Sequence, residues 1–157
     1  MTDSQLGVLA DELSNDPENL GYVTYLIAGS DTEVANLLNN KNIPGLVPVL
    51  STALLAWAGQ NNRYRKLEVA TLDADSPIYS VAKVALMMIQ RDGTSLDLSL
   101  SDRAAMLSAL VATNVLEQSD SDSLYELAAG MVSRAEVLGL NYVSDLDIAK
   151  AKVLNVN

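Results

Sequence analysis

Apolar residues recur at helical spacing along most of the chain, and short stretches rich in Ser, Asp, Asn, Pro or Gly interrupt them. Leu6, Leu9 and Leu13 form one such stripe, and the stretch 78–90 carries another. Residues three or four positions apart lie on the same face of a helix, so each stripe predicts an amphipathic helix. We therefore expect an all-α fold, a compact multi-helix bundle of about eight or nine short helices.

Capping residues predict where several of these helices begin. Asp16 followed by Pro17 is typical of an N-cap with proline in the first helical position, and Ser30 with Glu33 has the spacing of a capping box. Because proline is tolerated only in an opening turn, the fourth helix is expected at about 47–58. This helix is apolar around most of its circumference, which favours a central position.

The second half of the chain contains one stretch with a different pattern. Residues 94–100 mostly alternate polar and apolar positions, as a strand does, but no second convincing strand exists to pair with them. We expect an extended connector there. One long helix is expected from 119 to about 139, and Ser144 can cap a short helix over 145–153.

The length of the chain predicts a single domain. At 157 residues, a chain can bury roughly two-thirds of the surface that it exposes when unfolded. We expect one helical domain over residues 1–157, in which 141–157 is a candidate for an extended or docking C-terminal segment.

Charge and composition argue against several classes of function. The chain has 20 acidic and 10 basic residues, and a net charge of −10 opposes binding to nucleic acid or to an anionic membrane. It contains neither cysteine nor histidine, which removes disulfides, thiolate nucleophiles and the commonest metal ligand. No stretch has the uninterrupted apolar length of a membrane span.

Paired carboxylates are the only abundant material for catalysis. General acid/base or metal chemistry would need two of them to converge in a cleft. Each pair instead lies at an expected helix start, where a negative charge is favourable, and no phosphate-binding loop, calcium loop or nucleophile elbow is present. We therefore expect no enzyme activity, no catalytic or metal-binding residues and no cofactor. The pairs are Asp73 with Asp75, Asp120 with Asp122, and Asp145 with Asp147.

One short basic stretch, from Arg63 to Lys66, stands out in this acidic chain. It is interpreted either as a solvated helix face that balances nearby carboxylates, or as a docking patch for an acidic surface such as another copy of the chain. Trp57 is expected in the core or in a subunit interface. The candidate interface residues are Arg63, Tyr64, Arg65, Lys66, Trp57 and Tyr142.

Segments near the two ends of the chain resemble a family of small structural proteins of tailed bacteriophages. The first is Asn15-Asp-Pro-Glu-Asn-Leu-Gly-Tyr22, followed by Val34-Ala-Asn-Leu-Leu-Asn39, and the second is Val132-Ser-Arg-Ala-Glu-Val-Leu-Gly-Leu140. The stretch from about 41 to 119 matches that family only as helix. Glu18 departs from the pattern, because the family often has leucine after the proline.

The resemblance implies a virion-associated structural protein that works by assembly. Its most favoured place is the head-tail connector or neck region, as an adaptor, and the expected partners are other virion proteins and copies of itself. The alternatives are a tail, fibre-attachment or capsid-surface protein, or a soluble helical module that binds a host protein. The expected location is the virion, after assembly in the host cytoplasm.

Overall fold

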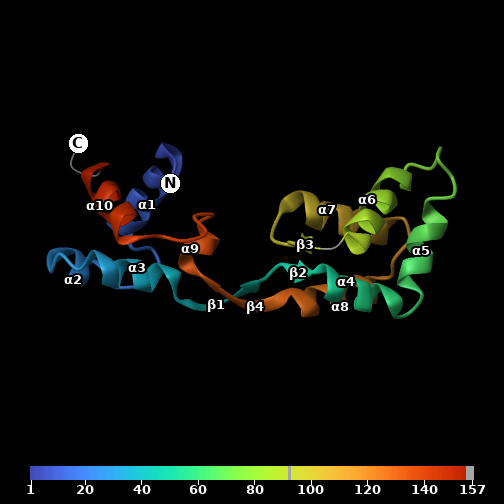
Figure 1. The fold of residues 1–157 in the computed structure, drawn as a ribbon, viewed down its shortest axis with the longest axis horizontal. Coiled ribbons are helices and arrows are strands. Elements are labelled where there is room, and N and C mark those ends of the chain that lie inside the picture. Colours follow the sequence, from blue (N-terminus) through green and yellow to red (C-terminus); the bar gives the residue numbers. More distant parts are fainter. Residues whose placement is uncertain (92, 155–157) are drawn as a thin grey trace. The chain divides into compact units, whose positions relative to one another are not determined.

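The fold is predominantly helical, with two small two-stranded sheets (Figure 1). The computed structural model describes residues 1–91 and 93–154. Its contacts divide the chain into two compact units. Unit 1 consists of Met1–Pro44 together with the segment from Met131 to the C-terminus, and unit 2 consists of Gly45–Gly130. The two ends of the chain therefore belong to the same unit.

Unit 1 is built on α10, which packs against α1 and α3. The helix α3 also contacts α2 and α9. The helices of unit 1 are α1 (Asp3–Asn15), α2 (Tyr22–Ile27), α3 (Asp31–Asn39), α9 (Arg134–Val137) and α10 (Asp145–Leu154). The core takes apolar residues from all five helices and from the segment before α10, among them Leu9, Leu13, Tyr22, Val34, Leu38, Ala135, Val143 and Ile148.

Unit 2 has its own core, and α6 contacts α4, α5 and α7. Its helices are α4 (Ser51–Gly59), α5 (Arg63–Ala70), α6 (Tyr79–Gln90), α7 (Ser101–Ala112) and α8 (Gln118–Ala128). The core side chains include Leu54, Trp57, Leu67, Ile89, Leu110 and Leu124. Such a core rests on aliphatic packing, in which alanines such as Ala58 and Ala82 let helix backbones approach closely.

Two pairs of short strands make the expectation of a purely all-α fold wrong, although its coarser form, a mostly helical chain, is confirmed. The strand β1 (Lys41–Leu46) pairs with β4 (Ala129–Ser133), and the boundaries between the units fall inside both strands. The strand β2 (Val49–Leu50) pairs with β3 (Ser95–Leu96) in antiparallel register, with Val49 opposite Leu96.

The second sheet changes the expectation for residues 94–100. The missing partner strand is β2, which occupies residues that were expected to open the fourth helix. Pro48 restricts Val47 to extended backbone, and α4 begins only at Ser51. The expected long helix over 119–139 also ends early, because the chain turns into β4 after Ala128.

Asp16 ends a helix instead of starting one. It is the C-cap of α1, with a left-handed φ of 39°, and its carboxylate accepts hydrogen bonds from the backbone N–H groups of Leu20 and Gly21, at 2.7 and 2.8 Å. Gly21 is also left-handed, with φ 82°, and α2 begins one residue later at Tyr22. The prediction that Asp16 and Pro17 start a helix is wrong, because the Asp16 carboxylate closes a turn over the residues that follow it.

The C-terminal segment packs within unit 1. Ser144 caps α10 as expected: its Oγ accepts a hydrogen bond from the Asp147 backbone N–H at 3.2 Å. Ile148 and Ala151 are fully buried, so α10 contributes side chains to the core of unit 1. The expectation that 141–157 serves as a docking segment stays a prediction. The expectation of one domain over residues 1–157 stays a prediction. It requires the two units to unfold together in a single transition.

Gly130 provides a test of the backbone path at the start of β4. A Cβ atom added at Gly130 would lie 2.8 Å from Cγ1 of Val47, whose β-branched side chain has little freedom to move. We expect Gly130→Ala to lower the free energy of unfolding by about 1–3 kcal/mol, as overpacking does. Chemical denaturation followed by circular dichroism measures the change.

Gly7 is the matched control for this substitution. It lies within α1, and an added Cβ would meet no atom within 4 Å. Gly7→Ala should therefore raise the free energy of unfolding, by about 0.5–1 kcal/mol. Equal effects at the two positions would contradict the close approach of Gly130 to Val47.

Candidate functional site

The second end segment is joined to α1 by a buried ion pair in unit 1. Arg134, the first residue of α9, donates from Nε to Oε1 of Glu12 at 2.9 Å and from Nη2 to Oε2 at 2.7 Å. Glu12 lies in α1 and is only 4% exposed. The two parallel hydrogen bonds give the strong, oriented contact that arginine makes with a carboxylate.

Two further residues of the first end segment complete this contact. The Tyr22 hydroxyl, fully buried, donates to Oε1 of Glu12 at 3.1 Å. On the exposed side, Nη1 of Arg134 reaches Oε1 of Glu18 at 3.4 Å. We call these four residues, Glu12, Glu18, Tyr22 and Arg134, the end-segment network. Glu18, which departs from the phage-family pattern, thus has a cationic partner in this chain.

The electrostatics of the end-segment network favour the observed protonation states. Burial raises the pKa of Tyr22 well above its ordinary value of 10.0, and the negative charge of Glu12 adds to that effect. The hydrogen bonds to Glu12 raise the pKa of Arg134, which outweighs the opposing effect of burial. Tyr22 therefore stays neutral as a donor, and Arg134 stays charged.

The string Ser133-Arg-Ala-Glu136 has a structural role at each position. Ser133 and Glu136 form a reciprocal capping box around the start of α9, with backbone-to-side-chain distances of 2.7 and 3.2 Å. Ala135 is fully buried. Lys41 binds Oε1 of Glu136 at 2.8 Å, and this contact lowers the pKa of Glu136. Sequence analysis missed this capping box, although the Ser-x-x-Glu spacing is its signal.

Asn39 joins the first end segment to the chain before α10. Its side-chain amide donates from Nδ2 to the carbonyl of Val143 at 2.7 Å and accepts at Oδ1 from the N–H of Val143 at 2.9 Å. The amide therefore pairs with a backbone as a neighbouring strand would. Within the end segments, Asp16, Asn39 and Ser133 thus make their polar contacts inside unit 1.

The predicted basic stretch divides into a buried part and an exposed part, because α5 turns its residues around the helix axis. Arg63 is only 4% exposed and lies on the same face as Leu67, four residues on. Its Nε donates to Oδ1 of Asp120 at 2.7 Å, and its Nη1 donates to the carbonyl of Trp57 at 2.9 Å. Arg63 is thus an interior residue of unit 2 rather than part of a solvated face.

Trp57 belongs to the same interior cluster. The Arg63 guanidinium lies 4.8 Å from the centre of the Trp57 ring, and the indole N–H donates to Ser123 Oγ at 3.0 Å. With 7% of its surface exposed, Trp57 takes the core position that was one of its two expected places. Trp57 and Arg63 are therefore not available as an exposed contact surface within unit 2.

Asp120 holds three groups together at the start of α8. Its Oδ1 binds Arg63, and its Oδ2 accepts from the Glu117 backbone N–H at 3.0 Å and from Lys66 Nζ at 3.2 Å. Burial alone would raise the pKa of Asp120, but the hydrogen bonds from Arg63, Glu117 and Lys66 outweigh it and hold the pKa below 3.8. Lys66 also binds Glu117 Oε1 at 2.9 Å, and its pKa is raised.

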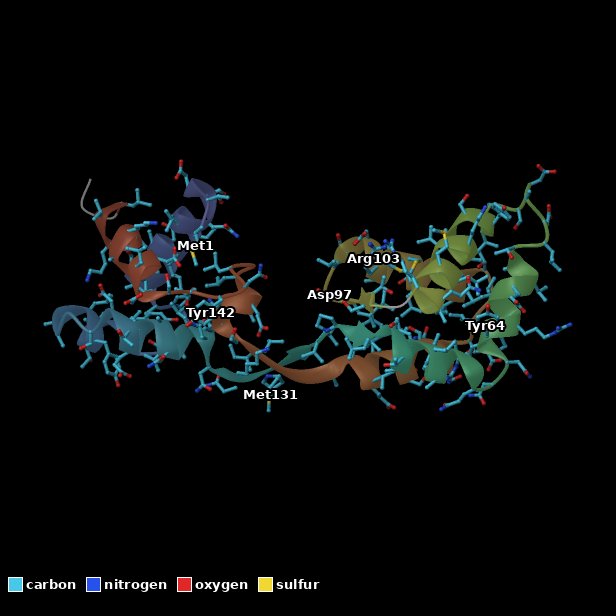
Figure 2. All side chains as sticks on the ribbon, viewed as in Figure 1. Met1, Tyr64, Asp97, Arg103, Met131 and Tyr142 are labelled. Atoms are coloured by element: carbon cyan, nitrogen blue, oxygen red, sulfur yellow. The ribbon has the colours of Figure 1, made fainter. Side chains whose placement is uncertain are left out.

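The exposed part of the basic stretch borders an open groove, which we call the α5 groove. Arg65 is exposed, and Tyr64 and Lys66 are half-buried. Tyr64, labelled in Figure 2, accepts a hydrogen bond from Gln90. The groove has a volume of about 760 Å³ and is lined by Asn62, Arg65, Lys66, Val69, Ala70, Ile78, Asn114 and Val115.

Tyr142, the remaining candidate interface residue, lies in unit 1 and is 71% exposed (Figure 2). Its side chain borders a depression of mixed polar and apolar lining together with α3 residues that include Leu37. Tyr142 therefore lies in a different unit from the basic stretch, and its role in an interface stays a prediction.

The carboxylates of the three pairs lie in different surroundings within residues 1–91 and 93–154. Asp120 is buried against Arg63 whereas Asp122 is exposed, and Asp147 is bound to Ser144 at 2.6 Å. The described residues contain no group of three or more acidic residues placed to hold a metal ion. A cavity of about 30 Å³ within unit 2 is lined by apolar side chains such as Leu54, Leu67 and Leu110.

Replacement of Tyr22 tests the end-segment network. We expect Tyr22→Phe to lower the free energy of unfolding by about 1–3 kcal/mol at pH 7, because a hydrogen bond to a buried carboxylate is lost. Tyr22 has a raised pKa in the folded state, so its contribution is complete below about pH 10 and is lost as the pH rises towards the folded value.

Urea denaturation of the wild type and of Tyr22→Phe at pH 7 and at pH 10.5 measures this difference, which should narrow at the higher pH. Tyr142→Phe, at an exposed position, is the matched control and should change stability by less than about 0.5 kcal/mol. If the difference in free energy of unfolding between the wild type and Tyr22→Phe were larger at pH 10.5 than at pH 7, Tyr22 would not act as a buried donor.

Asp120 tests the interior cluster of unit 2. Asp120→Asn leaves Arg63 buried without its counter-charge, and we expect a loss of about 3–5 kcal/mol in the free energy of unfolding. The folded-state pKa of Asp120 is depressed, so its contribution is complete above about pH 4 and disappears as the pH falls below that value. Thermal or urea unfolding at pH 7 and pH 3 measures both effects.

Asp122→Asn is the matched control, because Asp122 lies in the same helix and is exposed. The double variant Arg63→Met with Asp120→Leu removes both charges and should lose less stability than Asp120→Asn alone. If Asp120→Asn were as stable as Asp122→Asn, the buried ion pair would not hold α5 to α8.

The comparisons with known proteins add no relative from which a function could be transferred. No protein-family model, no curated protein and no solved structure matches the chain. Among the helices of the described residues, none is long and apolar enough to cross a membrane. The function is therefore inferred from the residues and contacts of the chain itself.

Proposed function

We propose that this chain is a structural, non-catalytic component of a tailed-bacteriophage virion, in the head-tail connector or neck region. The observation that carries this proposal is the meeting of the two family-like end segments in one unit. Arg134 of the second segment pairs with Glu18 of the first, and both Arg134 and Tyr22 bind the buried Glu12. Segments that were compared with the phage family as separate strings are thus parts of one structural motif.

Polar residues of the end segments fix the backbone of unit 1, which is the role expected of residues that preserve a fold. Asp16 closes the turn before α2, Asn39 pairs with the backbone of Val143, and Ser133 caps α9. None of these contacts leaves a polar group directed at a substrate. They support a family likeness in the fold of unit 1 and a role in assembly.

Exposed apolar side chains on both units also favour assembly. Ile27 is 83% exposed and Tyr142 is 71% exposed in unit 1, and Leu72 is 81% exposed in unit 2. Single exposed apolar residues are common on soluble proteins. Here they are accompanied by an apolar and basic groove in an otherwise acidic chain, a combination suited to protein partners.

The proposal is tested by locating the chain in purified particles. Mass spectrometry and cryo-electron microscopy of virions should find it in several copies at the junction of head and tail. A phage that lacks the gene should accumulate unjoined heads and tails. Density on the tail, fibre or capsid surface would favour another virion position, and absence from purified particles would contradict the proposal and favour a host-binding module.

Complementation of such a deletion phage links the function to unit 1. Arg134→Met, which leaves Glu12 buried and unpaired, should reduce the titre of joined particles at least tenfold at an elevated growth temperature. Glu126→Gln, at an exposed position of α8, should complement fully. Full complementation by Arg134→Met would show that the end-segment network is not needed for assembly.

A further inference from the structure

The α5 groove carries a cation that has no acidic partner among residues 1–91 and 93–154. Arg65 is exposed and forms no ion pair within residues 1–91 and 93–154, whereas the neighbouring Lys66 is bound to Glu117 and Asp120. The whole chain has a net charge of −10. A basic site in such a surface favours an acidic partner, and the most abundant acidic surface available to it is another copy of the chain.

The floor of the α5 groove is apolar. Val69 is 53% exposed, and Val115, Ala70 and Ile78 line the same space. A segment that fills the groove should therefore combine a large apolar side chain with carboxylates at a short distance from it, because each part of the groove then gains a matching partner.

The segment Leu72–Asp75 of the same unit has this composition. Leu72 is 81% exposed, and both Asp73 and Asp75 are exposed. Figure 1 shows the stretch between α5 and α6 extending beyond the helices of unit 2 as a loop. Apart from the hydrogen bond of 3.1 Å that Asp73 accepts from the Asp75 N–H, the side chains of this segment make no hydrogen bond or ion pair among the described residues.

We propose that the Leu72–Asp75 segment of one copy docks in the α5 groove of a second copy. Leu72 contacts Val69 and Val115 of the second copy, and Asp73 and Asp75 pair with its Arg65. The loop lies between Ala70 and Ile78, which both line the groove, so groove and loop adjoin each other in one copy. Two copies that exchange loops reciprocally form a closed dimer, and copies that each use the loop of the next form a ring or a filament.

This inference deepens the proposed function, on which its biological setting rests, because it names the partner and the contact surface. A contact between copies of the chain suits a component that works by assembly. Self-association of the purified full-length chain can nevertheless be measured without any other virion protein, so the contact is tested separately from the location of the chain in the virion.

A charge-swap experiment tests the contact. Arg65→Glu makes the groove acidic, and the double variant Asp73→Lys with Asp75→Lys makes the loop basic. Analytical ultracentrifugation and native mass spectrometry should show that each variant alone self-associates at least tenfold more weakly than the wild type. Mixed in equal amounts, the two variants should assemble again, because each then offers the surface that the other lacks.

The mixture has a second expected property. Its assemblies should contain equal numbers of the two variants in alternation, which native mass spectrometry resolves from the mass difference. Lys150→Glu, at an exposed position of unit 1, is the matched control for the change in net charge and should self-associate as the wild type does. Circular dichroism confirms that each variant is folded.

Three outcomes would overturn the inference. These are a wild type that stays monomeric at high micromolar concentration, self-association that survives Arg65→Glu, or variants that both lose association and do not recover it on mixing. In each case, detection of the chain in purified particles would leave the proposed function standing with a different contact. Absence from particles, with the loop and groove contact intact, would contradict the function and leave the contact established.

Discussion

The ion pair between Glu12 and Arg134 is the constraint on which the architecture depends. It joins residues 122 positions apart, and all of unit 2 lies between them in the sequence. Closing so long a loop has an entropic cost, although this cost grows only slowly with loop length. Once the pair is closed, α9 and the chain that follows are held where α10 can pack against α1 and α3.

A buried ion pair is weak evidence of net stability, because both charges lose their hydration. The Glu12–Arg134 pair does, however, restrict how the helices of unit 1 can pack. Glu12 accepts from Arg134 and Tyr22 at once. An arrangement that moves Arg134 leaves Glu12 buried without a counter-charge, and one that moves Tyr22 removes a hydrogen bond from the buried carboxylate. Unit 2 repeats the same solution with Arg63 and Asp120, and in both units one arginine holds together helices that lie far apart in the chain. In a chain with few aromatic residues, these contacts select among alternative packings of similar apolar helices.

The sequence predicts the helices better than the contacts that select their arrangement. Apolar stripes are local, and the start of α10 after Ser144 follows from residues close in sequence. The strands β2 and β3 are two residues long, and their pairing joins Val49 to Leu96, which no local pattern can indicate. Asp16 was misread for a related reason. The same Asp-Pro pair can open a helix or close the preceding one, and the choice depends on how the following residues are packed.

The basic stretch shows where a reading of charge alone fails. The four residues 63–66 form one cluster in the sequence, but the helix turns Arg63 inward beside Leu67 and leaves Arg65 exposed. Helical spacing could have distinguished the buried Arg63 from the exposed Arg65, because Arg63 lies four residues before the buried Leu67 and shares its helix face. The inward residue then needs an acid, and Asp120 could not be chosen from the many carboxylates without the fold.

The two units differ in how much of their polar surface is free to bind a partner. The end segments carry the family likeness, and their polar side chains are used within unit 1 in contacts such as Asn39 with Val143. A side chain engaged in this way has little capacity left to distinguish partners. The α5 groove and the exposed Leu72–Asp75 segment lie in the middle stretch, which resembles the family only as helix. Under the proposed function, the fold of unit 1 is the shared part of the protein, and the choice of partner is determined by the surface of unit 2.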